Sequence, residues 1–240
     1  RDETTILGAT KLTGKRSGWT YGMLTAVTAR EYAVVESPVT EPDGTTSYVR
    51  GERLIEPATS YNVARVQRDL MNGSSYVGAL FTGVFREQMD DAFTGGIDYT
   101  LRWDRNRTNF NGHWAVTHAP GVGGIKTSGG GVTNFNVSRK HLNVFTHYDR
   151  FGKEFRPNDI GFFRVRANRN QANAGMEVFN PDPWKGLRRI GSGFSVSRGW
   201  TDERLVWQNY REFWVFTQFR NFWATNGGMF AESDVQDDLD

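Results

Sequence analysis

Residues 93–104 read FTGGIDYTLRWD, and this stretch decides the fold because its side chains alternate between two kinds. One alternate set is apolar or glycine and includes Ile97 and Leu101, whereas the other set includes Asp98 and Arg102. Successive side chains of a β-strand point to opposite sides of the sheet. The stretch therefore predicts a strand with one apolar face and one ionic face.

Long segments with the same period of two recur along the chain, at residues 19–30, 76–86, 142–149 and 205–225. Runs of about 10 to 13 residues exceed the strands of globular proteins, which commonly have about 5 to 6 residues. A tilted strand needs about 9 to 11 residues to cross a bilayer, whereas a helix needs roughly 20 consecutive apolar residues, and no such run is present. These lengths favour an all-β fold, an antiparallel up-and-down transmembrane β-barrel with roughly a dozen strands in this chain.

The composition agrees with such a sheet and excludes several other classes of protein. The 240 residues include 14% aromatic residues and 27 glycines, yet the mean hydropathy is −0.58. A sheet with one lipid face and one wet face needs this mixture, although a soluble β-sandwich uses it too. The 29 Lys and Arg residues nearly balance 27 Asp and Glu residues, so no broad positive surface indicates nucleic acid. With 0 cysteines, disulfide scaffolds and cysteine zinc sites are excluded.

Turn sequences separate the expected strands. Short connections are predicted at residues 15–18, 72–74, 105–107, 169–171 and 199–202, with longer ones around residues 31–59 and 119–131. All 7 prolines are expected outside the strand interiors, since proline donates no ladder hydrogen bond. In the run 205–225, Trp214, Phe216 and Phe222 fall on the polar side. That run is therefore expected to contain a bulge or unusually large inward-facing residues.

Several short stretches carry a resemblance to a known family. They are TILGATKLTGK at residues 5–15, AVTAR at 26–30, ARVQRD at 64–69, TGGIDY at 94–99 and NDIGFFR at 158–164. In their order and spacing, from residue 4 to about residue 238, they resemble a bacterial family that has no assigned function and carries a C-terminal outer-membrane barrel. In that family the barrel typically follows a periplasmic module similar to family-nine carbohydrate-binding modules.

The resemblance implies that residues 1–240 are one outer-membrane β-barrel domain and correspond to the first part of that barrel. The carbohydrate-binding module and the later barrel strands are then expected outside this chain. The family brings no catalytic residues to carry over.

Charged side chains within the expected strands are the first candidate site. An arginine or lysine that faces acyl chains costs roughly 2 to 4 kcal/mol at the bilayer midplane, so these groups are expected to face inward or to lie at the rim. They either make a pore selective or brace the interior as structural ion pairs. The expected inward-facing residues are Arg65, Asp69, Asp98, Arg102, Arg164, Arg166, Glu212 and Arg220.

Aromatic residues near the expected strand ends are the second candidate site. Amphipathic rings favour the headgroup level of a bilayer, which predicts an interfacial girdle. The alternatives are packing in a sandwich core and stacking against sugars. The expected girdle residues are Trp19, Tyr21, Tyr99, Trp103, Trp114 and Trp223.

No catalytic, cofactor or metal site is expected. His113 and His118 are five residues apart, so on one strand they face opposite sides. The sequence around Ser192 is not a nucleophile elbow, and the glycines near Lys126 do not form a phosphate-binding loop.

These patterns lead to one functional hypothesis and three rivals. The hypothesis is a bacterial outer-membrane barrel, not an enzyme, that serves solute passage or surface anchoring linked to glycan or nutrient handling. Its expected partners are outer-membrane lipid, a glycan or small solute, and other envelope proteins, but not nucleic acid. The rivals are a soluble glycan-binding β-sandwich, a glycoside-processing enzyme with a carboxylate pair, and a sealed barrel that anchors a periplasmic module.

Overall fold

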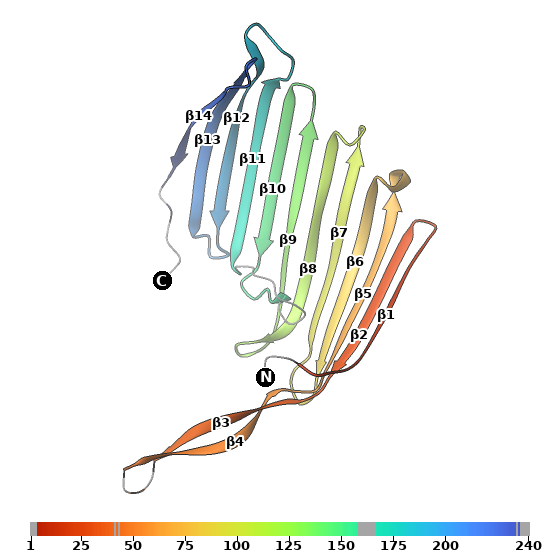
Figure 1. Cartoon of the computed structure of the whole chain (residues 1–240), viewed down its shortest axis with the longest axis vertical. Helices are drawn as coiled ribbons and strands as arrows, with labels where there is room; N and C mark the ends of the chain where they lie inside the picture. Colours follow the sequence, from red (N-terminus) through yellow and green to blue (C-terminus); the bar gives the residue numbers. More distant parts are fainter. Residues whose placement is uncertain (1–3, 41, 43, 158–166, 234, 236–240) are drawn as a thin grey trace.

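The computed structural model describes residues 4–40, 42, 44–157, 167–233 and 235. In these residues the chain forms one sheet of twelve antiparallel strands and one projecting two-stranded hairpin (Figure 1). The strands of the large sheet are β1 (Ile6–Arg16), β2 (Trp19–Thr28), β5 (Thr59–Leu70), β6 (Ser75–Arg86), β7 (Ala92–Trp103), β8 (Thr108–Gly121), β9 (Gly124–Ser138), β10 (Leu142–Phe151), β11 (Arg169–Asn180), β12 (Leu187–Trp200), β13 (Val206–Phe219) and β14 (Ala224–Glu232). The hairpin consists of β3 (Glu31–Thr40) and β4 (Thr46–Glu56).

The strand order confirms the predicted all-β, antiparallel, up-and-down fold. Each strand of the large sheet pairs with its neighbour in sequence, except that β2 pairs with β5 and the hairpin β3–β4 is left outside. Among the described residues the sheet does not close, so β1 and β14 form its two edges. A single helical turn, η1 (Met71–Gly73), precedes β6, and no described helix has the length and apolar character to span a membrane.

The two ends of the sheet differ in their connections (Figure 1). At one end, here called the turn end, the connections are short, and the tightest joins β1 to β2 through Ser17 and Gly18. Both residues have positive φ, 50° and 77°, as in the hairpin turns that match the strand twist. The opposite end, here called the loop end, carries the longer segments 29–58, which contains the hairpin, and 152–168.

The register gives the sheet one face rich in apolar side chains, here called the apolar face. Val66, Ala79, Ile97 and Trp114 lie opposite one another across β5 to β8 and define this face. Further along, Phe194 lies opposite Phe213 on the same face. The face is therefore continuous from β5 to β13.

The other face, here called the polar face, carries the alternate residues. Gln67, Gly78, Asp98 and His113 lie opposite one another across the same four strands, and Asp149 continues the row on β10. The alternation predicted from residues 93–104 thus extends across the sheet.

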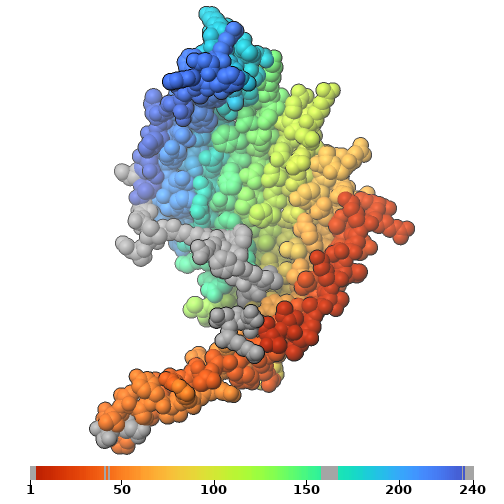
Figure 2. Space-filling view, viewed as in Figure 1, coloured from red at the N-terminus to blue at the C-terminus, as the bar shows by residue number. Residues whose placement is uncertain are grey.

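No second layer of described residues covers the apolar face, because the substantial contacts between elements run between neighbouring strands. Ile97 is 57% exposed, Val116 52% and Phe81 50%. The chain exposes 16310 Å², whereas a compact monomer of this mass exposes about 11,000 Å². Figure 2 shows the sheet as one broad wall from which the hairpin projects. A wall of this kind has no ordinary globular core.

Glycine makes room for large rings on the polar face. Trp214 lies opposite Gly193, and a Cβ atom at Gly193 would overlap its indole. Phe216 lies opposite Gly191 in the same way, with 2.6 Å between its Cε1 atom and a Cβ added to that glycine. The rings therefore lie over the neighbouring strand, which covers part of their area. The β12–β13 pairing also has register shifts, and these lie near its two ends, one of them between Val206 and Gln208.

Four details of the predicted strands are wrong. The run 205–225 is two strands, because a turn separates β13 from β14. Residues 119–131 are not a loop, since β8 and β9 continue to a tight turn, and residues 169–171 begin β11 rather than form a turn. Pro38 and Pro120 lie within strands. Pro38 is tolerated because β3 has one free edge, and Pro120 because it lies beside the hairpin tip.

Candidate functional site

Ion pairs cross the strands on the polar face near the turn end. The guanidinium of Arg65 on β5 donates to both carboxylate oxygens of Asp98 on β7, at 2.8 and 2.7 Å. Asp69 receives Lys15 Nζ at 2.7 Å, and Gln67 lies between the two pairs, where it donates to Asp69 and accepts from Arg65, each at 3.3 Å. Arg65, Asp69 and Asp98 therefore share one face, as the spacing of Arg65 and Asp69 predicts for those two residues.

A hollow of about 560 Å³ lies beside the Arg65–Asp98 pair. Its lining combines this pair with Tyr76, Asn111 and His113 from neighbouring strands. The hollow therefore offers a cation, an anion and neutral donors and acceptors to a polar molecule.

A second set of hydrogen bonds continues the polar face towards β13. Asn134 donates to Asn111 at 3.1 Å, and His147 contacts Asn134 at 2.7 Å and Asp149 at 3.1 Å. Asp149 is buried, and its Oδ1 atom has no hydrogen-bond partner. The polar side chains thus hold one another across several strands rather than extend separately into solvent.

The first part of the long connection after β10 folds back over the polar face. The backbone N–H of Gly152 donates to the carbonyl of Gly129 at 3.0 Å, and that of Arg156 donates to Thr117 Oγ1 at 3.1 Å. Phe155 between them is buried and would meet a Cβ on Gly130 at 3.0 Å. Residues 152–157, here called the cover segment, therefore occupy space above β8 and β9.

A charged tether fixes the cover segment to the next loop. Lys153 Nζ lies 2.9 Å from Glu203 Oε1, and Asn168 donates to Glu203 Oε2 at 2.8 Å. These hydrogen bonds, that of Asn168 first, lower the pKa of Glu203 to about 2, and the same carboxylate raises the pKa of Lys153. Both ends of the connection are thus held at the loop end.

Aromatic rings form a row on the apolar face. The ring centroids of Trp114 and Tyr148 are 6.1 Å apart, and those of Tyr148 and Trp200 are 6.4 Å apart. The indole N–H of Trp114 and the hydroxyl of Tyr99 both reach Thr133 Oγ1 at 2.9 Å. Trp114 and Tyr99 therefore keep their polar atoms paired while their rings stay half-buried, a combination suited to an interface between water and an apolar medium.

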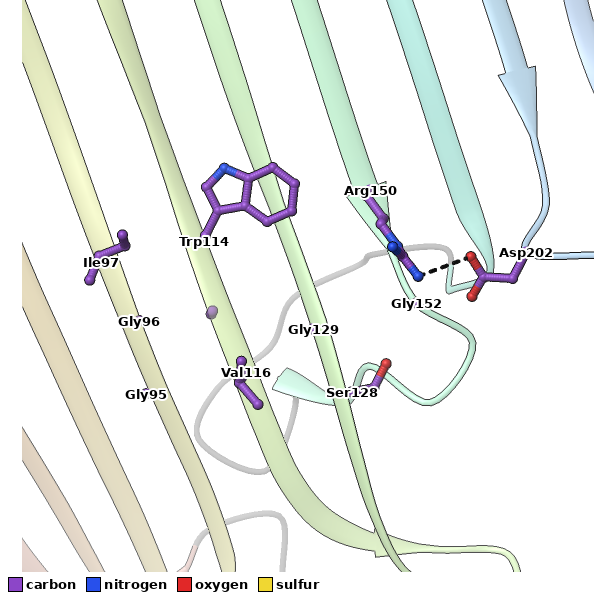
Figure 3. A pocket seen from close by; sticks show the side chains of 11 residues that line it. Gly95, Gly96, Ile97, Trp114, Val116, Ser128, Gly129, Arg150, Gly152 and Asp202 are labelled. Carbon is purple, nitrogen blue, oxygen red and sulfur yellow. Dashed lines mark ion pairs between the residues drawn. The ribbon is translucent and has the colours of Figure 1, made fainter.

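A hollow of about 560 Å³ lies beside this row (Figure 3). Gly95 and Gly129 leave room, and Trp114 and Val116 stand at its sides. At the loop end of the hollow, Arg150 Nη2 lies 3.5 Å from Asp202 Oδ1. This arginine on the apolar face is accordingly neutralised by a loop carboxylate.

At the turn end, Trp19 and Arg68 occupy the apolar face together. The guanidinium carbon of Arg68 lies 5.2 Å from the indole centroid of Trp19 and the side chain donates to the Ser17 carbonyl at 2.5 Å. Tyr21 and Trp103 also belong to this face. Trp19 and Trp103 stand at strand ends, whereas Trp114 lies in the middle of β8 and Tyr99 lies four residues before the end of β7, so the expected position near a strand end is wrong for Trp114.

The remaining predicted residues have varied positions. Arg102 and Glu212 lie on the polar face, opposite Asn109 and Ser195. Arg220 and Trp223 lie in the turn between β13 and β14, not on a strand. Arg164 and Arg166 lie outside the described residues.

In the part of the chain that the structure describes, no group of His, Asp and Glu residues is arranged to hold a metal ion. His113 and His118 lie on opposite faces of β8, as their spacing predicts. His113 belongs to the polar hollow, whereas His118 bonds Thr127 Oγ1 at 2.7 Å.

Sequence reasoning overlooked the cover segment and the His147–Asp149 pair. The even spacing of His147 and Asp149 was a usable signal, since it places both on one face of β10. The contacts of Phe155 had no local signal, because residues 152–157 are irregular and meet strands more than twenty positions earlier.

The comparisons with known proteins add one assignment. A family model described as a domain of unknown function (DUF5916) matches residues 1–239. The chain belongs to that family. No curated protein and no protein of solved structure matches it. Membership in DUF5916 assigns no activity to the chain.

Proposed function

We propose that this DUF5916 chain forms part of the wall of a β-barrel in the bacterial outer membrane and that its polar face lines a passage for small polar solutes. One observation carries the proposal: a single layer of long strands has one exposed apolar face and one face of paired polar groups.

The apolar face calls for an apolar medium. Each Å² of apolar surface removed from water contributes roughly 25 cal/mol, and this face includes the exposed side chains of Ile97, Val116 and Met176. Barrel strands satisfy their backbone groups between themselves, which makes such a sheet suitable for a bilayer once its edges are paired. Trp200 of the aromatic row and the Trp19–Arg68 contact supply amphipathic groups at the ends of their strands.

The side chains of the polar face are suited to contact with solutes that carry little net charge. Lys15 pairs with Asp69 and Arg65 pairs with Asp98, so these two carboxylates are balanced by cations, while Asp149 bonds the imidazole of His147. The hollow beside Arg65 presents hydroxyl and amide groups as well. A passage lined in this way favours neutral or zwitterionic polar solutes, among which are small glycans.

We assign no catalytic step to the chain. Asp69 and Asp98 on the polar face are each paired with a cation, and this arrangement suits bracing and solute contact. The resemblance to barrels that follow a carbohydrate-binding-like module supports a link to glycan or nutrient handling at the cell envelope.

The connections support an orientation for the barrel. Outer-membrane barrels have short periplasmic turns and longer extracellular loops. The turn end is therefore assigned to the periplasm, and the loop end, with the hairpin β3–β4 and the cover segment, to the exterior.

A sealed anchoring barrel is the second candidate. Phe155 and its neighbours cover part of the polar face and are tied down by Glu203. Such a segment narrows a passage, and in a barrel of small diameter it closes the passage.

The test uses the full-length protein reconstituted into liposomes. Flotation with the vesicles and faster swelling in small sugars than in large ones are the expected results. A protein that is monomeric in buffer without detergent and does not float would overturn the membrane assignment in favour of a soluble binding module. A protein that floats but produces no swelling with any sugar would overturn passage in favour of the anchoring barrel.

A further inference from the structure

Two arginines on the apolar face have no partner among the described residues. Arg198 on β12 lies opposite Asn209, and Arg211 on β13 lies opposite Val196. The two arginines are therefore diagonal neighbours on one face, within reach of each other's long side chains. Both are exposed. The arginine nearby on β10, Arg150, differs because Asp202 neutralises it.

A hollow of about 510 Å³ lies in front of these arginines. Its floor is made by Ala172 and Ala174, which lie between the arginine strands and β10. Tyr148 and Thr146 stand on the opposite side, directly across from the two alanines. The site is concave rather than flat, because small residues lie in its middle and guanidinium, phenol and hydroxyl groups surround them.

The position of the hollow on the apolar face favours a lipid as its ligand. Towards the turn end it borders the apolar side chains of Phe194 and Phe213, and towards the loop end it borders Trp200, two residues beyond Arg198. A molecule in the hollow therefore touches acyl-chain surroundings on one side and interfacial aromatics on the other. In a bilayer, a lipid headgroup lies at this boundary between acyl chains and water. A free solute in the passage would instead contact the polar face, on the other side of the sheet.

We propose that Arg198 and Arg211 bind the phosphate of a lipid headgroup in the leaflet at the loop end. This inference rests on the proposed membrane location. Paired guanidinium groups match phosphate oxygens in charge and in fork geometry, and Tyr148 adds a hydroxyl donor. An unpaired guanidinium is costly beside acyl chains, and an anionic headgroup removes that cost.

The experiment compares the full-length protein in vesicles of phosphatidylcholine alone and in vesicles with added phosphatidylglycerol. Native mass spectrometry after detergent extraction measures how much phosphatidylglycerol stays bound. The variant R198Q/R211Q is expected to retain about tenfold less, because each basic residue near the surface attracts anionic lipid. The charge-matched control R53Q/R105Q removes two arginines from β4 and from the turn after β7 and is expected to behave as wild type.

The outcomes separate the lipid site from the membrane assignment. Failure of wild type to float with vesicles overturns the proposed function itself. Flotation with equal retention by wild type and R198Q/R211Q overturns the lipid site alone. Displacement of most of the bound phosphatidylglycerol by millimolar inorganic phosphate also overturns the lipid site, since the two arginines would then bind a free anion.

Discussion

The ion pair between Arg65 and Asp98 passes over Gly78 on the strand between them. A Cβ atom on Gly78 would lie 2.8 Å from Asp98 Oδ1 and 3.2 Å from Arg65 Nη2. Because Gly78 has no side chain, Arg65 on β5 can form a bidentate ion pair with Asp98 on β7 across the intervening strand β6. The pair braces three strands together.

Gly78→Val is expected to destabilise the sheet by about 1 to 2 kcal/mol, because the added methyl groups displace a partly exposed ion pair. Gly95→Val is the matched control, since a Cβ there meets no atom within 4 Å. Urea midpoints of the two variants in the same detergent measure the difference. Equal midpoints would show that the pair does not depend on Gly78.

Trp214→Ala is expected to cost about 1 to 3 kcal/mol, because the ring covers Gly193 and its loss leaves a depression on β12. Trp223→Ala serves as the control, because Trp223 is 76% exposed in the turn before β14. Thermal unfolding followed by near-ultraviolet circular dichroism compares them. A larger shift for the control would contradict the packing argument.

Phe155→Ala is expected to speed the swelling of liposomes in larger sugars, because the cover segment loses its buried contact with the polar face. Val122→Ala alters an equally apolar residue at the tip between β8 and β9, where the side chain is 85% exposed, and is expected to leave swelling unchanged. If both variants swell as wild type does, the cover segment does not limit passage.

As the pH falls, the cover segment is expected to detach from the polar face before the sheet itself unfolds. The folded pKa of Glu203, about 2, lies below its ordinary value of 4.5, so its contribution is complete above pH 4.5 and fades as the pH falls towards 2. Lys153 has a raised pKa and stays charged throughout this range. Hydrogen exchange of residues 152–157 should accelerate over that window in wild type. In Glu203→Gln the exchange should be fast already at pH 6 and change little on acidification.

Replacement of residues 31–56 by a short glycine–serine link is expected to preserve the large sheet. β2 pairs with β5 along its whole length without help from the hairpin, from Trp19 opposite Arg68 to Thr28 opposite Thr59. Amide protection in β2 and β5 measures this directly. Loss of protection there, with the rest of the sheet intact, would show that the hairpin stabilises the junction.

The sequence predicted the strands and their faces where period two is strong. Asp98 and Ile97 are on the expected opposite faces, and Arg65 and Asp69 share a face. The pattern failed between β13 and β14, because aromatic residues continue through the turn that contains Arg220 and Trp223. Alternation alone gives no sign where one strand stops.

Contacts that depend on strand register or on the path of a loop lay beyond sequence reasoning. The arginine pair at Arg198 and Arg211 depends on the register of β12 against β13, and the cover segment depends on how residues 152–157 leave β10. Such relationships arise from three-dimensional placement rather than from any local spacing.

Since nearly every strand joins its neighbour in sequence, the sheet grows by addition of adjacent hairpins. Closing each pair costs little loop entropy, and only the β2–β5 junction must wait for a long excursion to return. Insertion or duplication of one hairpin would consequently alter the circumference of the finished wall while every other pairing kept its partner, so relatives of different diameter can be reached by small genetic steps.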